Sequence, residues 1–247
     1  DLGLYAYELE SSERNGGREW YLSRTEHLSN TGEAEATLSG FAGQYALWYS
    51  QHSDLRKRLG EVRYGSSTGL WASANADKSR LHGLNGTTFK QKTYGGSLGL
   101  DVLSDVRTDS MFILGMLFRT AHADQKVSGP AEGRLDSVGG VMYGTWVHDN
   151  GWYVDATAGL DRFKHKISTK MSDGTPVKDH RSDYAFSASL DVGRKMNFHY
   201  SNEGRDYWFA EPQLQLSFFE LDSGHYTASN GMTVDRKSMD SLTGRAG

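Results

Sequence analysis

The sequence lacks cysteine, long apolar runs and a strong net charge. Its 247 residues contain no cysteine, and Asp and Glu outnumber Lys and Arg only enough to give a net charge of -4. The lack of cysteine excludes disulfides and thiolate metal sites. The lack of any run of about 18 apolar residues excludes a transmembrane helix. Because the basic residues are scattered along the chain, no electrostatic footprint for nucleic acid is present.

The negative mean hydropathy does not exclude a membrane protein built from strands. A β-barrel that crosses a membrane keeps half of each strand polar, so averaging along the chain conceals it. The length suits one large domain, or a domain with a short appendage. The chain starts at Asp1 without a signal peptide, so we expect a mature fragment.

Several strand-length segments alternate apolar residues with small, polar or acidic ones. The clearest is 184–193, where Tyr184, Phe186, Ala188, Leu190 and Val192 share one face. The pattern recurs in 94–102, 152–163 and 208–218. Successive side chains of a strand point to opposite faces, so each segment has one apolar and one polar side. The apolar side is the core of a soluble sandwich, or the lipid-facing side of a transmembrane barrel.

The first part of the chain is organised differently. Residues 1–24 predict a hairpin with a turn at Asn15-Gly16-Gly17, and we assign residues 1–30 to the end of another domain. Apolar residues at helical spacing then predict one helix over 31–60, interrupted near Gly40 and Gly43. About 27 helical residues extend ~40 Å, the thickness of a bilayer with its headgroups. The alternative is a surface helix packed on a sheet.

The remainder, 61–247, predicts an antiparallel sheet. About eight strand candidates lie near 61–75, 88–103, 110–124, 134–148, 151–167, 182–198, 206–220 and 231–247. Asp149-Asn-Gly151 predicts a tight turn, whereas 77–87, 126–135 and 167–181 are long and polar. Short turns at one end and long loops at the other are typical of outer-membrane barrels. Aromatic residues near strand ends would form an interfacial girdle, namely Trp71, Trp146, Trp152, Tyr153, Tyr184, Tyr207 and Trp208.

Charged residues on the polar faces predict contacts between helix and barrel. Three basic residues near the end of the helix would meet acids inside the lumen and fix the helix there. The alternative is that each charge is simply solvated or paired within the barrel. The candidate luminal contacts are Arg56, Lys57, Arg58, Asp101, Arg119, Asp155, Asp161, Asp191 and Glu211.

No residue pattern predicts catalysis, and we expect no catalytic residue, no cofactor and no metal. The histidines show no metal-ligand spacing. Gly65-Ser-Ser-Thr-Gly69 matches the nucleophile-elbow pattern, but strand-like sequence follows where a helix is required. Two rival functions stay open: an outer-membrane barrel hydrolase with acids and histidines at its rim, and a soluble carbohydrate-binding or ligand-binding β-protein.

Seven stretches resemble the C-terminal translocator barrel of bacterial autotransporters, in the pertactin-like group. Their order and spacing over 54–247 make the resemblance specific. They are Asp54-Leu-Arg-Lys-Arg-Leu-Gly-Glu-Val-Arg63, Gly69-Leu-Trp-Ala72, Gly95-Gly-Ser-Leu-Gly-Leu-Asp101, Tyr143-Gly-Thr-Trp146, Gly151-Trp-Tyr-Val-Asp155, Glu211-Pro-Gln-Leu-Gln-Leu216 and Asn230-Gly-Met-Thr-Val234.

The resemblance implies a 12-stranded antiparallel transmembrane β-barrel with an N-terminal helix in its lumen. It implies a monomer in the outer membrane of a Gram-negative bacterium that secretes and displays an upstream passenger. Its partners would be outer-membrane lipid, its own passenger and the barrel-assembly machinery. The hairpin over 1–24 resembles the last rungs of a passenger stalk. Self-cleaving members use an Asn pair on the helix; here only Asn30 is present, so no cleavage residue is assigned.

The sequence departs from that family in one respect. Family barrels end in an aromatic residue after 12 strands, whereas this chain stops at Gly247 after about eight. An unfinished sheet leaves unpaired edges in lipid, which cost several kcal/mol per unsatisfied group. We therefore expect a truncated barrel over 61–247, since an eight-stranded closed barrel is too narrow for a helix beside inward side chains.

Overall fold

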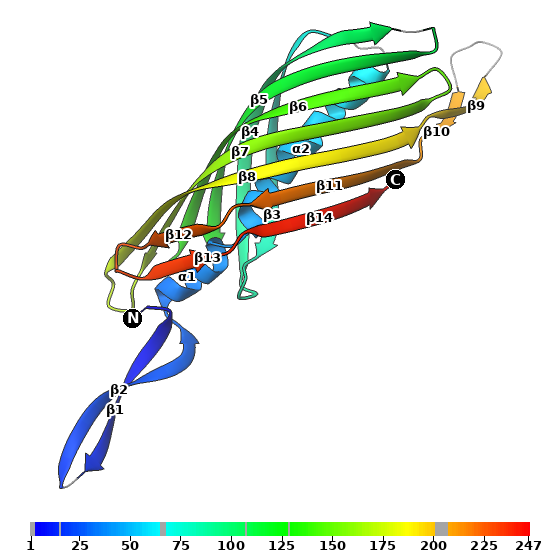
Figure 1. Ribbon diagram of the computed structural model, residues 1–247. Coiled ribbons are helices and arrows are strands. Elements are labelled where there is room, and N and C mark those ends of the chain that lie inside the picture. The colour runs from blue at the N-terminus through cyan, green and yellow to red at the C-terminus, as the bar shows by residue number, and fades with distance from the viewer. Residues whose placement is uncertain (1–2, 15, 65–67, 107, 128, 201–206) are drawn as a thin grey trace.

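The computed structural model describes residues 3–14, 16–64, 68–106, 108–127, 129–200 and 207–247. At the N-terminus, strands β1 (Tyr5–Arg14) and β2 (Gly17–Leu28) pair as an antiparallel hairpin that projects away from the rest of the molecule (Figure 1). Gly16, at the turn, has a φ of 79°, a conformation that favours glycine. The predicted hairpin is confirmed.

Two helices follow, α1 (Asn30–Leu38) and α2 (Ala42–Arg63). The Ser29 hydroxyl accepts a hydrogen bond from the Gly32 N–H at 2.9 Å and caps α1. The helix was predicted to be interrupted near Gly40 and Gly43: the break between the helices confirms this at Gly40, whereas Gly43 lies within the first turn of α2. The strand predicted from residue 61 is wrong at its start, because α2 continues to Arg63. No helix among the described residues is long and apolar enough to cross a membrane.

The main sheet contains eight antiparallel strands in the order β14-β11-β8-β7-β6-β5-β4-β3. Apart from β14 and β11, consecutive strands along the chain are neighbours in the sheet. Their bounds are β3 (Leu70–His82), β4 (Thr88–Val106), β5 (Ser110–Val127), β6 (Glu132–His148), β7 (Trp152–Lys170), β8 (Pro176–Arg194), β11 (Gln213–Leu221) and β14 (Met239–Ala246). The expected antiparallel β fold with an N-terminal helix is therefore confirmed.

Two short pairs extend the sheet at opposite ends. Strands β9 (Met196–Tyr200) and β10 (Tyr207–Ala210) pair beyond β8, and β12 (Gly224–Thr227) and β13 (Thr233–Arg236) pair near α1 (Figure 1). In the described residues, β3 and β14 are the two edges of the main sheet and do not pair with each other. The expectation of further strands stays a prediction.

The polar connectors are shorter than predicted. The tight turn at 149–151 is confirmed, since β6 ends at His148 and β7 starts at Trp152. The long loop predicted over 167–181 is wrong: β7 and β8 continue to Lys170 and from Pro176, so only 171–175 connect them. The predictions at 77–87 and 126–135 are wrong for the same reason. Only a few inward residues at these strand ends are apolar, such as Phe89, Ile167 and Val177, so the apolar alternation that would mark a strand is weak.

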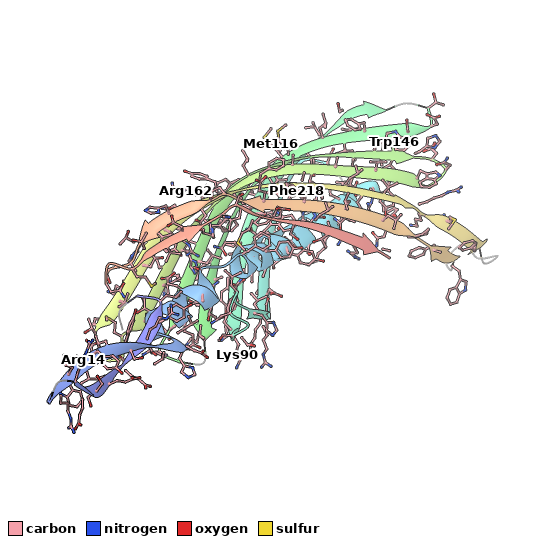
Figure 2. All side chains as sticks on the ribbon, turned by 60° about the horizontal axis from the view of Figure 1, so that its bottom comes forward. Arg14, Lys90, Met116, Trp146, Arg162 and Phe218 are labelled. Carbon is pink, nitrogen blue, oxygen red and sulfur yellow. The ribbon has the colours of Figure 1, made fainter. Side chains whose placement is uncertain are left out.

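The sheet curves around α2, which lies on its concave side (Figure 1). Side chains such as Met116 project from the convex side, away from the helix (Figure 2). Leu47 and Trp48 of α2 are 0% and 1% exposed and pack against Phe163 and Phe219 of the sheet. Two further apolar clusters lie along the helices, one around Ala34 and Leu38 and one around Leu55 and Leu59. The space between the helices and these strands is therefore packed with side chains.

The predicted aromatic girdle is partly wrong. Trp152 and Trp208 are exposed on the outside, at 42% and 77%. Trp71 and Tyr153 instead turn inward, where the Trp71 ring nitrogen donates to the Tyr143 hydroxyl and Tyr153 is 1% exposed. The inward rings pack beside arginines of α2, so aromatic residues at strand ends have two distinct roles. The side chain of Tyr207 lies outside the described part.

Candidate functional site at the helix–sheet interface

The C-terminal half of α2 is attached to the sheet by arginines. Arg58 binds Asp101 of β4 with two hydrogen bonds, Nε to Oδ2 at 3.0 Å and Nη2 to Oδ1 at 2.9 Å. The Asp101 side chain is fully buried and also accepts from the Gly69 N–H and the Tyr143 hydroxyl, each at 3.0 Å. Because two parallel hydrogen bonds join the guanidinium to the carboxylate, the pair fixes the relative orientation of the two side chains as well as their separation. The structure thus brings together Arg58 and Asp101, both of which the sequence indicates.

Arg63 forms a second attachment that the sequence analysis missed. Its Nη1 lies 2.5 Å from Asp155 Oδ2 of β7, and its Nη2 lies 3.9 Å from Glu211. Its guanidinium stacks 3.8 Å from the centre of the Tyr153 ring. Arg63 was excluded because the predicted helix ended at residue 60. Arg56 and Arg63 are seven residues apart, about two helical turns, and this spacing is the signal that could have extended the helix.

Two neighbouring basic residues point in different directions. Arg56 Nε lies 3.8 Å from Asp191 Oδ2 of β8, and its side chain is 18% exposed. Lys57 is 74% exposed and pairs with Asp54 on its own helix at 3.5 Å. Of the three candidate basic residues, the structure therefore brings Arg56 and Arg58 to carboxylates of the sheet and leaves Lys57 at the surface of the helix.

Arg119 and Asp161 pair within the sheet itself. Arg119 Nε donates to Asp161 Oδ1 at 2.8 Å, and a second bond joins Nη2 to Oδ2. Both side chains are buried. The Asp161 side chain lies over Gly139, where a Cβ atom would collide with Oδ1. This pair braces strands β5 and β7 across β6, and neither residue contacts the helix through a hydrogen bond.

Neutral polar side chains line the middle of the interface. Gln91 of β4 donates to the backbone carbonyl of Gly43 at 3.1 Å, and Gln125 of β5 donates to Gln91 at 2.8 Å. The His165 Nε2–H donates to Gln125 Oε1 at 2.8 Å. A side chain at Gly43 would place Cβ 2.3 Å from the Gln125 amide nitrogen, so glycine permits this close approach. No sequence pattern indicated this chain of bonds.

A further network surrounds α1, at the end of the sheet nearest the hairpin. The Tyr226 hydroxyl donates to Glu35 at 3.1 Å and accepts from Arg181 at 2.5 Å. Arg236 pairs with Asp183 at 2.8 Å. All five side chains are buried and come from α1, β8, β12 and β13. Because they lie far apart in the sequence, only the fold brings them together.

The convex face of the sheet has a sharp chemical boundary. On β7 the outward residues run from Trp152 to Leu160 without a charge and continue with Arg162. Eight steps at ~3.4 Å make about 27 Å along the strand, comparable to the ~25 Å outward apolar band of outer-membrane barrels. We call the exposed apolar residues of this zone the apolar band; it includes Leu98, Leu100, Leu114, Met116, Phe118, Met142, Leu160, Phe186, Leu190, Leu214, Leu216 and Leu242.

The charges that the structure describes at the interface are mostly paired with one another. Within the described residues, no group of three or more His, Asp or Glu side chains is placed to hold a metal ion. The buried histidines serve packing: His52 stacks on Trp48, and His165 bridges Gln125 and Arg181. The serine of the Gly65-Ser-Ser-Thr-Gly69 pattern lies outside the described residues.

The sheet has long antiparallel strands and an outward apolar band, and it curves around a helix that buried ion pairs hold. These features define the class of outer-membrane β-barrel proteins. The comparisons with known proteins identify the family within that class. Residues 70–247 match the autotransporter β-domain family, and the chain belongs to that family. Domains of this family sit in the outer membrane of Gram-negative bacteria and serve the secretion and surface display of an attached passenger.

Individual relatives agree with this assignment. The chain is 33% identical over 221 residues to the pertactin autotransporter of Bordetella bronchiseptica, which covers 89% of this chain and 23% of pertactin. The chain thus spans about a quarter of that relative's length. The β-domain of the Bordetella autotransporter BrkA superposes with a TM-score of 0.61 at 25% identity, covering 73% of this chain and 68% of that structure. The translocator domain of NalP from Neisseria meningitidis superposes with a TM-score of 0.61 at 14% identity, covering 85% and 71%.

Proposed function

We propose that this chain anchors an upstream passenger in the outer membrane and guides its export to the cell surface, with no chemistry of its own. The observation that supports the proposal is the apolar band on the convex side together with α2 bound on the concave side. Lipid would contact the band, and the barrel-assembly machinery would insert the sheet. We further propose that the protein acts as a monomer and binds no nucleic acid.

The direction of the chain supports an orientation in the membrane. The N-terminal hairpin, α1 and the connections at 83–87, 171–175 and 228–232 gather at one end of the sheet (Figure 1). The turn at 149–151 and the C-terminal end of α2 lie at the other. We assign the hairpin end to the cell surface, because the proposed passenger would join the chain at the hairpin, and the other end to the periplasm.

The hairpin itself suits the end of a passenger stalk. Leu9 pairs opposite Leu22 in its register, and Leu9, Trp20 and Leu22 are 63%, 60% and 56% exposed. Apolar side chains left exposed on a two-stranded hairpin need a neighbour, because such a hairpin is marginal alone. Stacking on a preceding rung of a β-helix would cover them. We therefore propose that residues 1–30 close the passenger stalk and that residues 31–60 are the core of its linker helix.

The buried ion pairs would hold the linker helix inside the barrel. Arg58 with Asp101 and Arg63 with Asp155 lie near the periplasmic end, so they hold the helix where it joins the first strand. Buried pairs add little net stability over apolar replacements but cost several kcal/mol when one partner is lost. We propose that they fix the position of the helix after export.

The test uses the natural full-length gene in a Gram-negative host, with an epitope tag directly upstream of Asp1. Protease added to intact cells should destroy the tag, while the barrel is recovered intact from the outer-membrane fraction. A matched control places the tag in the turn at 149–151, where it should stay protected. A protected upstream tag, or a protein recovered in soluble form, would contradict the proposal and favour the ligand-binding alternative.

A further inference from the structure

The convex face changes character at one row of the sheet. Below the boundary the outward row of Leu98, Phe118, Gly140, Leu160 and Phe186 carries no charge from β4 to β8, and these residues follow one another in the strand register; on β11 the row continues with Glu220. Above it two mixed outward rows follow, with Arg162 in the first and Lys164 in the second, and the next two outward rows are mostly basic. The strands continue through this polar zone for several residues toward the hairpin end. The boundary is therefore a feature of the folded surface, not of any single segment.

Basic residues dominate the polar zone between β3 and β8. Eleven Lys and Arg side chains point outward there, against three carboxylates in the same rows, Asp124, Glu132 and Asp136. The basic residues are far apart or alternate with inward residues in the sequence, which is why they looked scattered. We call this set the basic belt: Lys78, Arg80, Lys90, Lys92, Lys126, Arg134, Arg162, Lys164, Lys166, Lys170 and Lys178.

Within the belt, like charges stand directly opposite each other. Lys78 pairs with Lys92 and Arg80 with Lys90 across β3 and β4. Like charges in opposing positions destabilise a sheet. In the described part of the chain, no ion pair joins any of these four side chains, whereas Lys126 has Glu132 at 3.9 Å. On β5, Asp124 stands opposite Lys92 and Lys126 stands opposite Lys90, so this part of the sheet keeps an excess of positive charge that a bound anion would offset.

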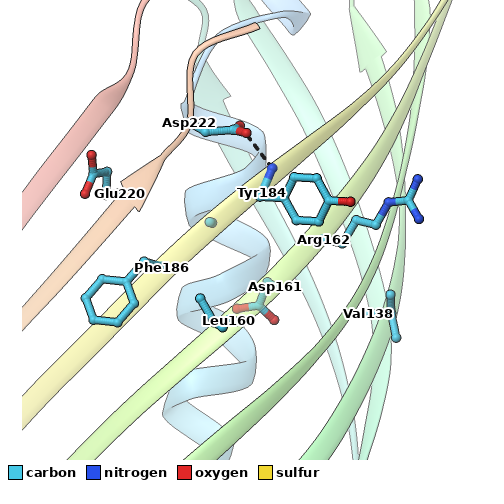
Figure 3. Close-up of a pocket in the computed structure, with 9 residues that line it drawn as sticks. Val138, Leu160, Asp161, Arg162, Tyr184, Phe186, Glu220 and Asp222 are labelled. Atoms are coloured by element: carbon cyan, nitrogen blue, oxygen red, sulfur yellow. Dashed lines mark hydrogen bonds between the residues drawn. The ribbon is translucent and has the colours of Figure 1, made fainter.

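A depression lies at the boundary beside the belt. It has a volume of about 460 Å³, and its apolar lining includes Val138, Leu160 and Phe186. Arg162 and Tyr184 stand at its edge, with the guanidinium 5.8 Å from the ring centre (Figure 3). The carboxylates Glu220 and Asp222 lie on the opposite side, where Asp222 accepts a hydrogen bond from the Tyr184 N–H at 3.0 Å. A chain of methylene groups fits the apolar floor, with its polar end toward Arg162.

We propose that the basic belt binds the phosphate groups of lipids in the outer leaflet, with an acyl chain of one such lipid in the depression. Phosphate suits this surface because Lys and Arg are its preferred partners and because several phosphates can neutralise the opposed charges together. The belt lies directly above the apolar band, at the depth of lipid head groups. The inference rests on the proposed orientation, which puts the belt at the cell surface.

The experiment measures lipid retained by the full-length protein. Wild type and variants are extracted from outer membranes in mild detergent, and bound phosphorylated glycolipid is quantified by mass spectrometry. The belt variant Lys78→Gln/Lys90→Gln/Lys92→Gln is compared with Arg14→Gln/Arg18→Gln/Arg24→Gln in the hairpin, which removes the same number of charges. The belt variant should retain at least about tenfold less lipid, and the hairpin variant as much as wild type.

A second arm identifies the chemical group. Delipidated protein is titrated with diphosphorylated lipid A, with the same lipid after phosphatase treatment, and with inorganic phosphate. Only the first should bind tightly. Equal binding of the dephosphorylated lipid, or unchanged retention by the belt variant, would overturn the proposal. Binding of inorganic phosphate alone would show an adventitious ion only, which also overturns it.

Failure of this inference can be separated from failure of the proposed function. The belt variant is also examined with the upstream tag and added protease. Loss of lipid with the tag still exposed supports the belt as a lipid site in a working translocator. A protected tag in wild type would instead contradict the orientation. If the belt variant does not fold, Lys164→Gln/Lys166→Gln on β7 repeats the test with the same expected direction.

Discussion

The bond between Arg58 and Asp101 leads to a quantitative prediction. Replacing Arg58 with methionine keeps the apolar stem and removes the charge, which leaves the fully buried Asp101 carboxylate with only the Gly69 and Tyr143 donors. Breaking a buried pair from one side costs about 3–5 kcal/mol. Because two hydrogen-bond donors to Asp101 remain, we expect a loss at the lower end of this range. The free energy with which α2 binds to the sheet should weaken by about 3 kcal/mol. This corresponds to a roughly 150-fold increase in the undocked population.

The assay exploits the absence of cysteine. A single Gln51→Cys substitution places a thiol on α2 at a position that is 3% exposed, and the rate of maleimide labelling reports how often the helix leaves the sheet. Arg58→Met should raise this rate by about two orders of magnitude. Adding Asp101→Asn should recover part of the loss, since the stranded charge is then removed, and the double-mutant cycle gives the pair's coupling energy.

The neighbouring lysine supplies a matched control. Lys57 is exposed and pairs only within its own helix at 3.5 Å, so Lys57→Met should change the free energy by less than about 0.5 kcal/mol. A loss below about 1 kcal/mol for Arg58→Met, typical of a surface ion pair, would refute the reasoning. Equal effects of the two substitutions would do the same.

Three further predictions concern packing and charge. Gly43→Ala should lower the free energy of unfolding by about 1–3 kcal/mol, because the added methyl group overpacks the interface. Gly60→Ala, where the nearest atom to an added Cβ is 3.6 Å away, should be neutral or stabilising in the same thermal-unfolding measurement. Equal effects of the two substitutions would contradict this prediction. Trp48→Ala should cost about 3–5 kcal/mol in urea unfolding, because the ring is 1% exposed; a smaller loss would mean that the interior collapses around the cavity. Asp173 accepts a backbone N–H in its turn, which lowers its pKa. The Asp173 carboxylate therefore stabilises the fold at pH values above its pKa in the unfolded chain, and this stabilisation is lost as the pH falls through its pKa in the folded protein. The difference in free energy of unfolding between wild type and Asp173→Ala should then vanish in acid. A difference that does not depend on pH would contradict this prediction.

The alternating strands were the part of the fold most open to prediction. Apolar and polar residues alternate strictly over 184–193. This alternation predicts a strand in any fold that places one face of the sheet against apolar groups and the other against polar groups. Prediction failed where both sides became polar. Beyond Ile167 the outward residues are polar and the inward ones include Thr169, Asp179 and Arg181, so no apolar alternation marks the strands there, and a loop was predicted over 167–181.

The sequence predicts that ion pairs join the helix to the sheet, but it does not predict which residues pair with each other. Acids on the polar faces and arginines at the end of a helix indicate pairing, and Arg58 with Asp101 and Arg56 with Asp191 are such pairs. Arg63 was missed because helix boundaries depend on local hydrogen bonds that propensity does not resolve. The Glu35 network was missed because its members come together only when β12 and β13 fold back over α1.

The packing of Leu47 and Trp48 against the sheet has a consequence for permeability. A pore through the outer membrane would leak small solutes, and a cell that keeps such pores open loses protection against toxic compounds. In the translocator proposed above, the linker helix would also close the passage, because Leu47 and Trp48 would occupy the space that solutes need. Export of the passenger and closure of the pore would then be completed in the same step.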